Sequence, residues 1–137
     1  MFRSFVPRVV LASLILGNVM LSYLGATNPA IDTTPGPLVV QPMDPTKAYF
    51  PTTGTFWDGG QTLSKITLQV KGTKTGSTDT LSEFKEYPVT SGYGQSYSGG
   101  VLTDYDSTRS YYLRAHLYND DGIAIAQSGW QAVPQSL

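Results

Sequence analysis

The sequence predicts an all-β domain, an antiparallel β-sandwich, preceded by a single N-terminal transmembrane helix. After residue 47 the apolar residues recur with a period of two, and clusters rich in Gly, Asn and Asp separate the short segments. Residues 9–26 instead form one long uncharged apolar run. The 137 residues have room for one domain. We therefore divide the chain into an N-terminal anchor (1–26), a proline-rich connector (27–46) and the sandwich (47–137).

The N-terminal segment combines two early arginines with a run long enough to cross a membrane. Arg3 and Arg8 precede an uncharged, mainly apolar run of 18 residues, 9–26, and a spanning helix needs about 17–25 residues. Positive residues stay on the cytoplasmic side, so we expect the N-terminus in the cytoplasm, residues 5–26 in the inner membrane and the C-terminal domain in the periplasm. A cleaved signal peptide is the alternative. Cutting after Ala26 would place the bulky Leu24 where signal peptidases prefer a small residue.

Small and polar residues form two stripes along the predicted helix. One stripe is Ser13 and Gly17, and the other is Asn18, Ser22 and Gly25. Residues three or four apart share a helix face, and small residues let membrane helices pack closely. We therefore expect these five residues to contact other membrane protein subunits. Signal peptides also contain Ser, Gly and Asn, so the alternative stays open.

The connector is rich in proline, with Pro29, Pro35, Pro37, Pro42 and Pro45 within residues 27–46. Proline excludes helix and the interior of a central strand, which predicts an extended spacer. Its one apolar cluster, residues 38–40, could pair at a sheet edge as a first strand or lie on a partner.

Period-two alternation locates the strands of the sandwich. Residues 66–70 and 111–118 alternate apolar with polar side chains, and the latter run is followed by a turn sequence at residues 119–122 and a return strand at 123–128. Weaker strands are predicted at residues 48–50, 55–57, 84–89 and 101–103.

Residues 111–122 read Y-Y-L-R-A-H-L-Y-N-D-D-G and fit the pattern Y-x-[VL]-R-[VA]-x-[AL]-x-N-x-x-G. This segment resembles the last hairpin of fibronectin type III and immunoglobulin-like domains. The resemblance implies that Tyr111 begins strand F and packs between two sheets, and that the domain binds or spaces rather than catalyses. Two features depart from the family: residues 66–70 lack its tryptophan, and Tyr105-Asp106-Ser107 replaces its leucine-x-proline run.

The charge and residue inventory contains no recognisable catalytic or metal-binding motif. Of nine Lys/Arg, two lie before residue 9, which leaves seven against ten Asp/Glu. This mildly acidic balance does not suit nucleic acid. There is no cysteine, and the single histidine, His116, cannot build a multi-histidine metal site. Asp104, Asp106, Asp120 and Asp121 could ligate calcium, but each pair is also ordinary turn chemistry. We expect no catalytic residue, metal, cofactor or small-molecule ligand.

Aromatic residues are the candidate partner contacts. Tyr93 and Tyr97 lie in the Gly/Ser-rich stretch 91–100, a frame that suits adaptable contacts. Trp57 and Trp130 are the other candidates.

The function predicted from these features is structural. We expect a single-pass accessory subunit that stabilises a larger bacterial membrane protein complex, for example a bioenergetic one, through its helix and its exported domain. The alternatives are a secreted or cell-surface binding or adhesion module with a cleaved signal peptide, and a filament subunit whose strand edges pair between copies.

Overall fold

The computed structural model describes residues 28–77, 80–89 and 95–135 of the chain. Over these ranges the protein consists of antiparallel strands and turns, which confirms the all-β prediction. Nothing in this part of the chain has the length and apolarity of a membrane-crossing helix. The predicted anchor, with Ser13, Gly17, Asn18, Ser22 and Gly25, lies outside the described residues, as does Tyr93.

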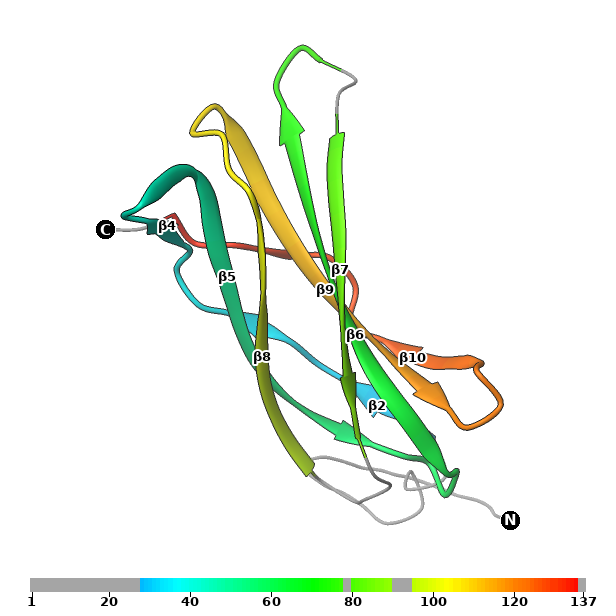
Figure 1. Ribbon diagram of the computed structural model, residues 1–137. Coiled ribbons are helices and arrows are strands. Elements are labelled where there is room, and N and C mark those ends of the chain that lie inside the picture. The colour runs from blue at the N-terminus through cyan, green and yellow to red at the C-terminus, as the bar shows by residue number, and fades with distance from the viewer. Residues whose placement is uncertain (1–27, 78–79, 90–94, 136–137) are drawn as a thin grey trace.

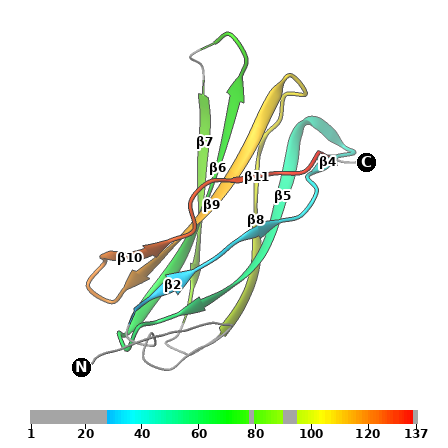
Figure 2. The same cartoon turned by 180° about the vertical axis from the view of Figure 1, so that it is seen from behind.

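The strands form two sheets that enclose the core between them (Figures 1 and 2). In the first sheet β5 (Asp44–Trp57) is central, with β8 (Gln95–Asp104) on one side. Its other side carries three short strands: β2 (Ala30–Ile31), β3 (Thr34–Pro35) and β4 (Val39–Gln41). The second sheet has the order β10 (Ala124–Gln127), β9 (Arg109–Asn119), β6 (Leu63–Lys74) and β7 (Thr80–Pro88), and β11 (Gln131–Ala132) also pairs with β9.

The proline-rich segment is extended, but it is part of the first sheet rather than a free spacer. Strand pairing begins at Ala30, and β4 confirms the edge-strand alternative for residues 38–40. The sheet accommodates these prolines because they occupy edge positions, or positions where no backbone N–H is needed for strand pairing. Pro51, in the middle of β5, faces the gap between β3 and β4, where the Gly36 N–H donates to the Pro51 carbonyl oxygen (3.0 Å).

Several strands are longer than predicted. The strands expected at residues 48–50 and 55–57 are parts of β5, and the strand at 101–103 is the end of β8. Residues 95–100, expected in a flexible frame, belong to β8 because Gly99 and Gly100 make room for side chains. A Cβ at Gly99 would lie 2.8 Å from the Tyr87 Cζ, and one at Gly100 would lie 2.3 Å from the Tyr49 Cζ.

Tyr87 also protects the outer edge of β8. Its hydroxyl donates to the Gly100 carbonyl (2.6 Å) and accepts from the Gly100 N–H (2.9 Å). An unpaired strand edge is a template for unwanted pairing. The phenol therefore occupies, at the middle of β8, the bonds that a neighbouring strand would make.

The core confirms the predicted alternation in β6 and β9. Their inward-facing residues are buried against residues of the first sheet such as Phe50; the largest of them are Ile66, Leu68, Val70, Tyr111, Leu113 and Leu117. The predicted turn between β9 and β10 is also present. The Asn119 Oδ1 accepts the N–H groups of Asp121 and Ile123 (3.0 Å each), and Gly122 has a φ of 78°.

Tyr111 joins the two sheets near the beginning of β9. It is 2% exposed, and its ring centroid lies 4.9 Å from that of Phe50 in β5. Its hydroxyl accepts the backbone N–H of Asp106 (2.8 Å), five residues upstream. The large apolar ring thus fills the core while its one polar atom is satisfied.

We predict that Tyr111→Phe lowers the free energy of unfolding by about 1–2 kcal/mol, because the Asp106 N–H loses its acceptor while the ring packing remains. Urea unfolding followed by circular dichroism measures this. Tyr112→Phe is the matched control, since Tyr112 is only half-buried. An equal loss in both variants would contradict a specific role for the Tyr111 hydroxyl.

Candidate functional site

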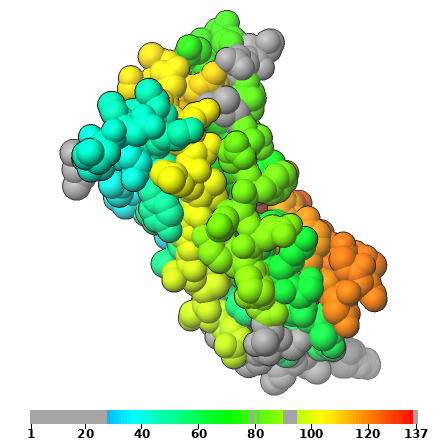
Figure 3. Space-filling model, viewed as in Figure 1, coloured from blue at the N-terminus to red at the C-terminus, as the bar shows by residue number. Residues whose placement is uncertain are grey.

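Exposed hydrophobic side chains gather at one end of the first sheet. Six large hydrophobic residues are exposed in the described part of the chain, and four of them lie here: Val39, Met43, Tyr49 and Leu102, which we call the apolar patch. Val39 pairs with Tyr49 and Tyr49 with Leu102, so these three form one row across β4, β5 and β8. Met43, 95% exposed, lies in the turn between β4 and β5. This hairpin forms a projecting corner of the molecule (Figure 3).

An ion pair borders the apolar patch. Lys47 pairs with Asp104 two residues along the strands from the Tyr49–Leu102 pair and therefore on the same face. The Lys47 Nζ lies 2.6 Å from the Asp104 carboxylate. The hydrogen bond and the charge of Asp104 raise the pKa of Lys47. The patch therefore has an apolar centre and a charged rim, as protein–protein interfaces do.

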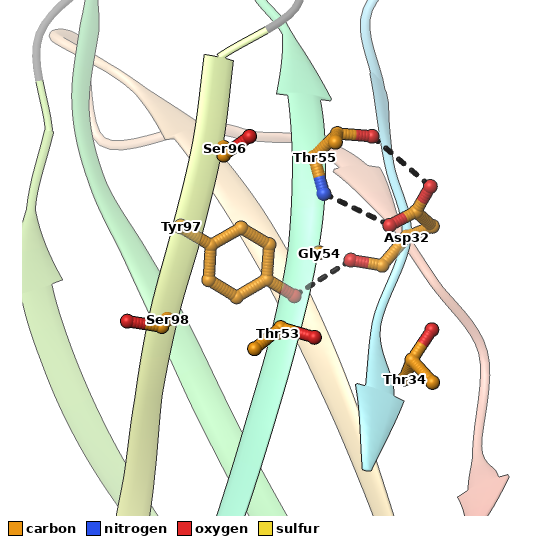
Figure 4. Close-up of a pocket in the computed structure, with 8 residues that line it drawn as sticks. All are labelled: Asp32, Thr34, Thr53, Gly54, Thr55, Ser96, Tyr97 and Ser98. Carbon is orange, nitrogen blue, oxygen red and sulfur yellow. Dashed lines mark hydrogen bonds between the residues drawn. The ribbon is translucent and has the colours of Figure 1, made fainter. Parts of the chain in front are cut away.

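A polar hollow lies toward the other end of β5 (Figure 4), and we call it the Tyr97 hollow. It is lined by Asp32, Thr34, Thr53, Gly54, Thr55, Ser96, Tyr97 and Ser98. The Asp32 carboxylate accepts the Thr55 N–H (2.9 Å) and the Thr55 hydroxyl (3.1 Å). Thr34, Thr53 and Ser98 form one register row, and Thr55 with Ser96 forms the next. The hollow is thus a grid of hydroxyl groups around one fixed carboxylate.

Tyr97 supports this hollow as well as lining it. Its hydroxyl donates to the Asp32 carbonyl oxygen (2.6 Å). Burial raises the pKa of Tyr97 to about 12, with opposing and reinforcing contributions from the Thr33 hydroxyl and the Asp32 charge. Tyr97 is therefore a half-buried strand residue, and not a side chain displayed on a loop as the sequence predicted. Trp57, the last residue of β5, lies on the same sheet beyond Thr55.

Trp130 lies on the other sheet, together with two cations. The Lys71 Nζ lies 4.3 Å from the Trp130 ring centroid and the Arg114 guanidinium carbon also lies 4.3 Å from it. Lys71 lies 5.7 Å from the Tyr112 ring as well. We call Lys71, Tyr112, Arg114 and Trp130 the Trp130 cluster. The predicted contacts Trp57 and Tyr97 thus lie on the first sheet, whereas Trp130 belongs to the second.

Sequence reasoning identified Trp130 but missed Lys71 and Arg114. Alternation placed Arg114 on the polar face of the strand predicted at residues 111–118, and Lys71 directly follows the strand predicted at 66–70. Only the pairing of β6 with β9 brings Lys71 opposite Tyr112 and Arg114 opposite Gln69. Trp130, between β10 and β11, then lies over both cations.

The neighbours of His116 and of the candidate calcium ligands are residues of the surrounding strands and turns. Burial, and then the positive charge of Arg114, lower the pKa of His116, so its imidazole is neutral at pH 7. Asp104 pairs with Lys47, and Asp106 accepts the Thr108 N–H (2.9 Å) and hydroxyl (2.7 Å). Within the described ranges no three His, Cys, Asp or Glu residues gather as a metal site would require.

Comparisons with known proteins add little to this geometry. No family model matches the chain, and no curated protein matches it. The solution structure of CsgH from R. palustris is similar over 72% of this chain and 90% of that one, with 15% identity and a TM-score of 0.37. Bacteroides uniformis β-glucuronidase 2 is similar over 77% of this chain but only 14% of its own length, with 14% identity and a TM-score of 0.36. Neither likeness carries a functional argument.

We predict that Gly54→Ala distorts the Tyr97 hollow and destabilises the fold by about 1–3 kcal/mol, the usual cost of overpacking. A Cβ at Gly54 would lie 2.2 Å from the Asp32 carbonyl oxygen and 2.7 Å from the Tyr97 Cε1. Gly36→Ala is the matched control, since its Cβ meets only the Pro51 Cγ at an ordinary 3.5 Å. Urea unfolding compares the two. Equal stability of both variants would contradict the tight contact at Gly54.

We predict that Tyr97 makes stability fall at alkaline pH. An unfolded tyrosine ionises near pH 10, whereas Tyr97 ionises near pH 12 in the folded protein, so the unfolded state loses its proton first and folding weakens as pH rises between these values. Tyr97→Phe should remove this part of the alkaline fall in unfolding free energy. Tyr118→Phe, on the other sheet, is the control. An unchanged slope in Tyr97→Phe would show that this phenol is not the group responsible.

Proposed function

We propose that this protein is a membrane-anchored accessory subunit that stabilises a larger bacterial membrane protein complex, for example a bioenergetic one, without catalysing a reaction. The apolar patch is the observation that carries the proposal. Large exposed apolar patches on protein surfaces usually mark sites of interaction with other molecules. The charged rim formed by Lys47 and Asp104 matches the polar border of such interfaces.

The position of the apolar patch favours a protein as its occupant. The patch adjoins the Asp44 end of β5, whereas Ala30, where strand pairing begins, pairs with Trp57 at the other end. The apolar row crosses β5 at Tyr49, eight residues before Trp57, which is about 26 Å along the strand. With residues 5–26 in the inner membrane, the Trp57 end would face the bilayer and the patch would lie far from it. We therefore propose that the patch covers an apolar surface on the periplasmic part of a partner membrane protein.

We also propose that the sandwich is of the fibronectin type III or immunoglobulin-like class, which serves mainly in binding and spacing. Tyr111 supports this. Immunoglobulin-type sandwiches have a tyrosine near the start of strand F whose hydroxyl bonds the backbone a few residues upstream. Tyr111 lies near the start of β9 and accepts the Asp106 N–H in the same manner.

The Tyr97 hollow favours a second candidate, a secreted or cell-surface adhesion module that binds carbohydrate. Rows of hydroxyl groups around the Asp32 carboxylate are groups that can bond to sugars. This candidate requires cleavage near Ala26. An intact mass of the protein purified from its native cells decides between the two, because a mature chain starting near Thr27 favours adhesion and a retained segment 1–26 favours the subunit.

We predict that Leu102→Asp releases the protein from its complex when native membranes are solubilised in mild detergent, because a carboxylate replaces the apolar contact. Ile123→Asp is the matched control: Ile123 is 58% exposed, close to the 59% of Leu102, but it lies in the turn after β9. Native gel electrophoresis with immunodetection measures the assembled fraction. A wild-type protein that migrates as a free monomer would contradict the proposal.

A further inference from the structure

Among the described residues, no carboxylate pairs with the two positive charges of the Trp130 cluster. Each of Lys47, Lys65 and Lys74 has a carboxylate within 4 Å, namely Asp104, Glu86 and Asp106. Lys71 and Arg114 have none within the described part of the chain, although both lie 4.3 Å from the same indole ring centroid. Two like charges around one ring repel each other, and an anion placed beside both would relieve that repulsion.

Arg114 is fixed in a way that leaves its binding groups available. Its Nε donates to the Gln69 Oε1 (2.9 Å), and the Gln69 Nε2 donates to the Ser82 Oγ (2.6 Å). Gln69 is only 9% exposed, so the amide that holds the Arg114 Nε is itself buried. The terminal nitrogens of Arg114 have no hydrogen-bond partner among the described residues. A guanidinium held by its Nε can present those nitrogens as a fork to a carboxylate.

The loop that carries Trp130 is also held in place. The Ser128 Oγ accepts the Ala115 N–H (3.0 Å), and the Ser128 N–H donates to the Ala115 carbonyl (3.0 Å). Gly129 then takes a φ of 75°, which places Trp130 after a sharp turn. The Arg114 guanidinium and the loop that carries the indole are therefore held in place before any ligand arrives, which lowers the entropic cost of binding.

The charge of the whole domain selects the kind of anion. From residue 27 onward the chain carries seven Lys/Arg and ten Asp/Glu. An extended polyanion such as nucleic acid, or an anionic bilayer, would also contact the acidic residues of the rest of the domain, which would repel it. A short acidic segment of a polypeptide would meet only the cluster. Beside it, exposed Phe84 pairs with Gln69 on the edge strand β7 and offers an apolar contact to such a segment.

We propose that the Trp130 cluster binds a carboxylate side chain in a short acidic segment of a partner protein, held between Lys71 and Arg114. This site lies on the second sheet, away from the apolar patch on the first, and so goes beyond the proposed accessory function.

Fluorescence of the full chain in mild detergent tests this site. Trp57→Phe leaves Trp130 as the single tryptophan, and the probe is an acetylated hexaglutamate peptide compared with hexaglutamine. We expect saturable binding of hexaglutamate that weakens with salt, and about tenfold weaker binding in Lys71→Gln and in Arg114→Gln. Lys71→Gln is the primary variant, because Arg114→Gln also removes the bond to Gln69.

Lys65→Gln is the matched control. Lys65 also lies over an aromatic ring of this sheet, 5.1 Å from the Tyr118 centroid, but it already pairs with Glu86 (2.8 Å). We expect its loss to change the affinity less than about twofold. Equal binding of the two peptides, or an equal loss in Lys65→Gln, would overturn the proposal. Competition by vesicles containing anionic lipid would overturn it in favour of a membrane surface. Leu102→Asp should leave peptide binding unchanged, which separates this test from that of the accessory function.

Discussion

The packing of Tyr111 between the sheets is the constraint on which much of the structure depends. Its ring contacts Phe50 of the first sheet and stacks on Tyr105, 5.8 Å away between centroids. The same ring requires a glycine on the neighbouring strand, because a Cβ at Gly72 would lie 2.6 Å from the Tyr111 Cε1. Its hydroxyl holds the backbone at Asp106, where the chain passes from β8 to β9. One side chain thus sets the spacing of the sheets and the path of the crossing chain.

The inward-facing positions form the shared core, whereas the outer faces of the two sheets expose different kinds of side chain. The first sheet exposes the apolar row of Val39, Tyr49 and Leu102 and, further along β5, the hydroxyl grid around Asp32. The second exposes aromatic rings with cations over them. Within the second sheet the cations also differ, because Lys65 pairs with Glu86, whereas Lys71 and Arg114 have no carboxylate partner among the described residues.

The sequence predicted those parts of the fold that depend on local pattern. Alternation in residues 66–70 and 111–118 and the Asn119–Gly122 turn are properties of neighbouring residues, and the structure confirms them. The prolines of residues 27–46 predicted a spacer, whereas the short strands β2, β3 and β4 of this segment pair with β5, because an edge strand tolerates residues that lack an N–H. Gly99 and Gly100 resembled a loop because Tyr87 and Tyr49, the rings that need the space, are distant in sequence.

The same dependence on register explains why the candidate surfaces were predicted only in part. Trp57, Tyr97 and Trp130 can be singled out by residue type alone, but strand pairing determines which residues lie beside them. It places Asp32 in contact with Tyr97, and Lys71 and Arg114 beside Trp130. The pairing also places the apolar patch and the Trp130 cluster on different sheets of one rigid core. With the two proposed contact surfaces, one on each sheet, the domain would bind two segments of an assembly at once. Each contact then raises the effective concentration for the other, so two modest surfaces suffice for stable association.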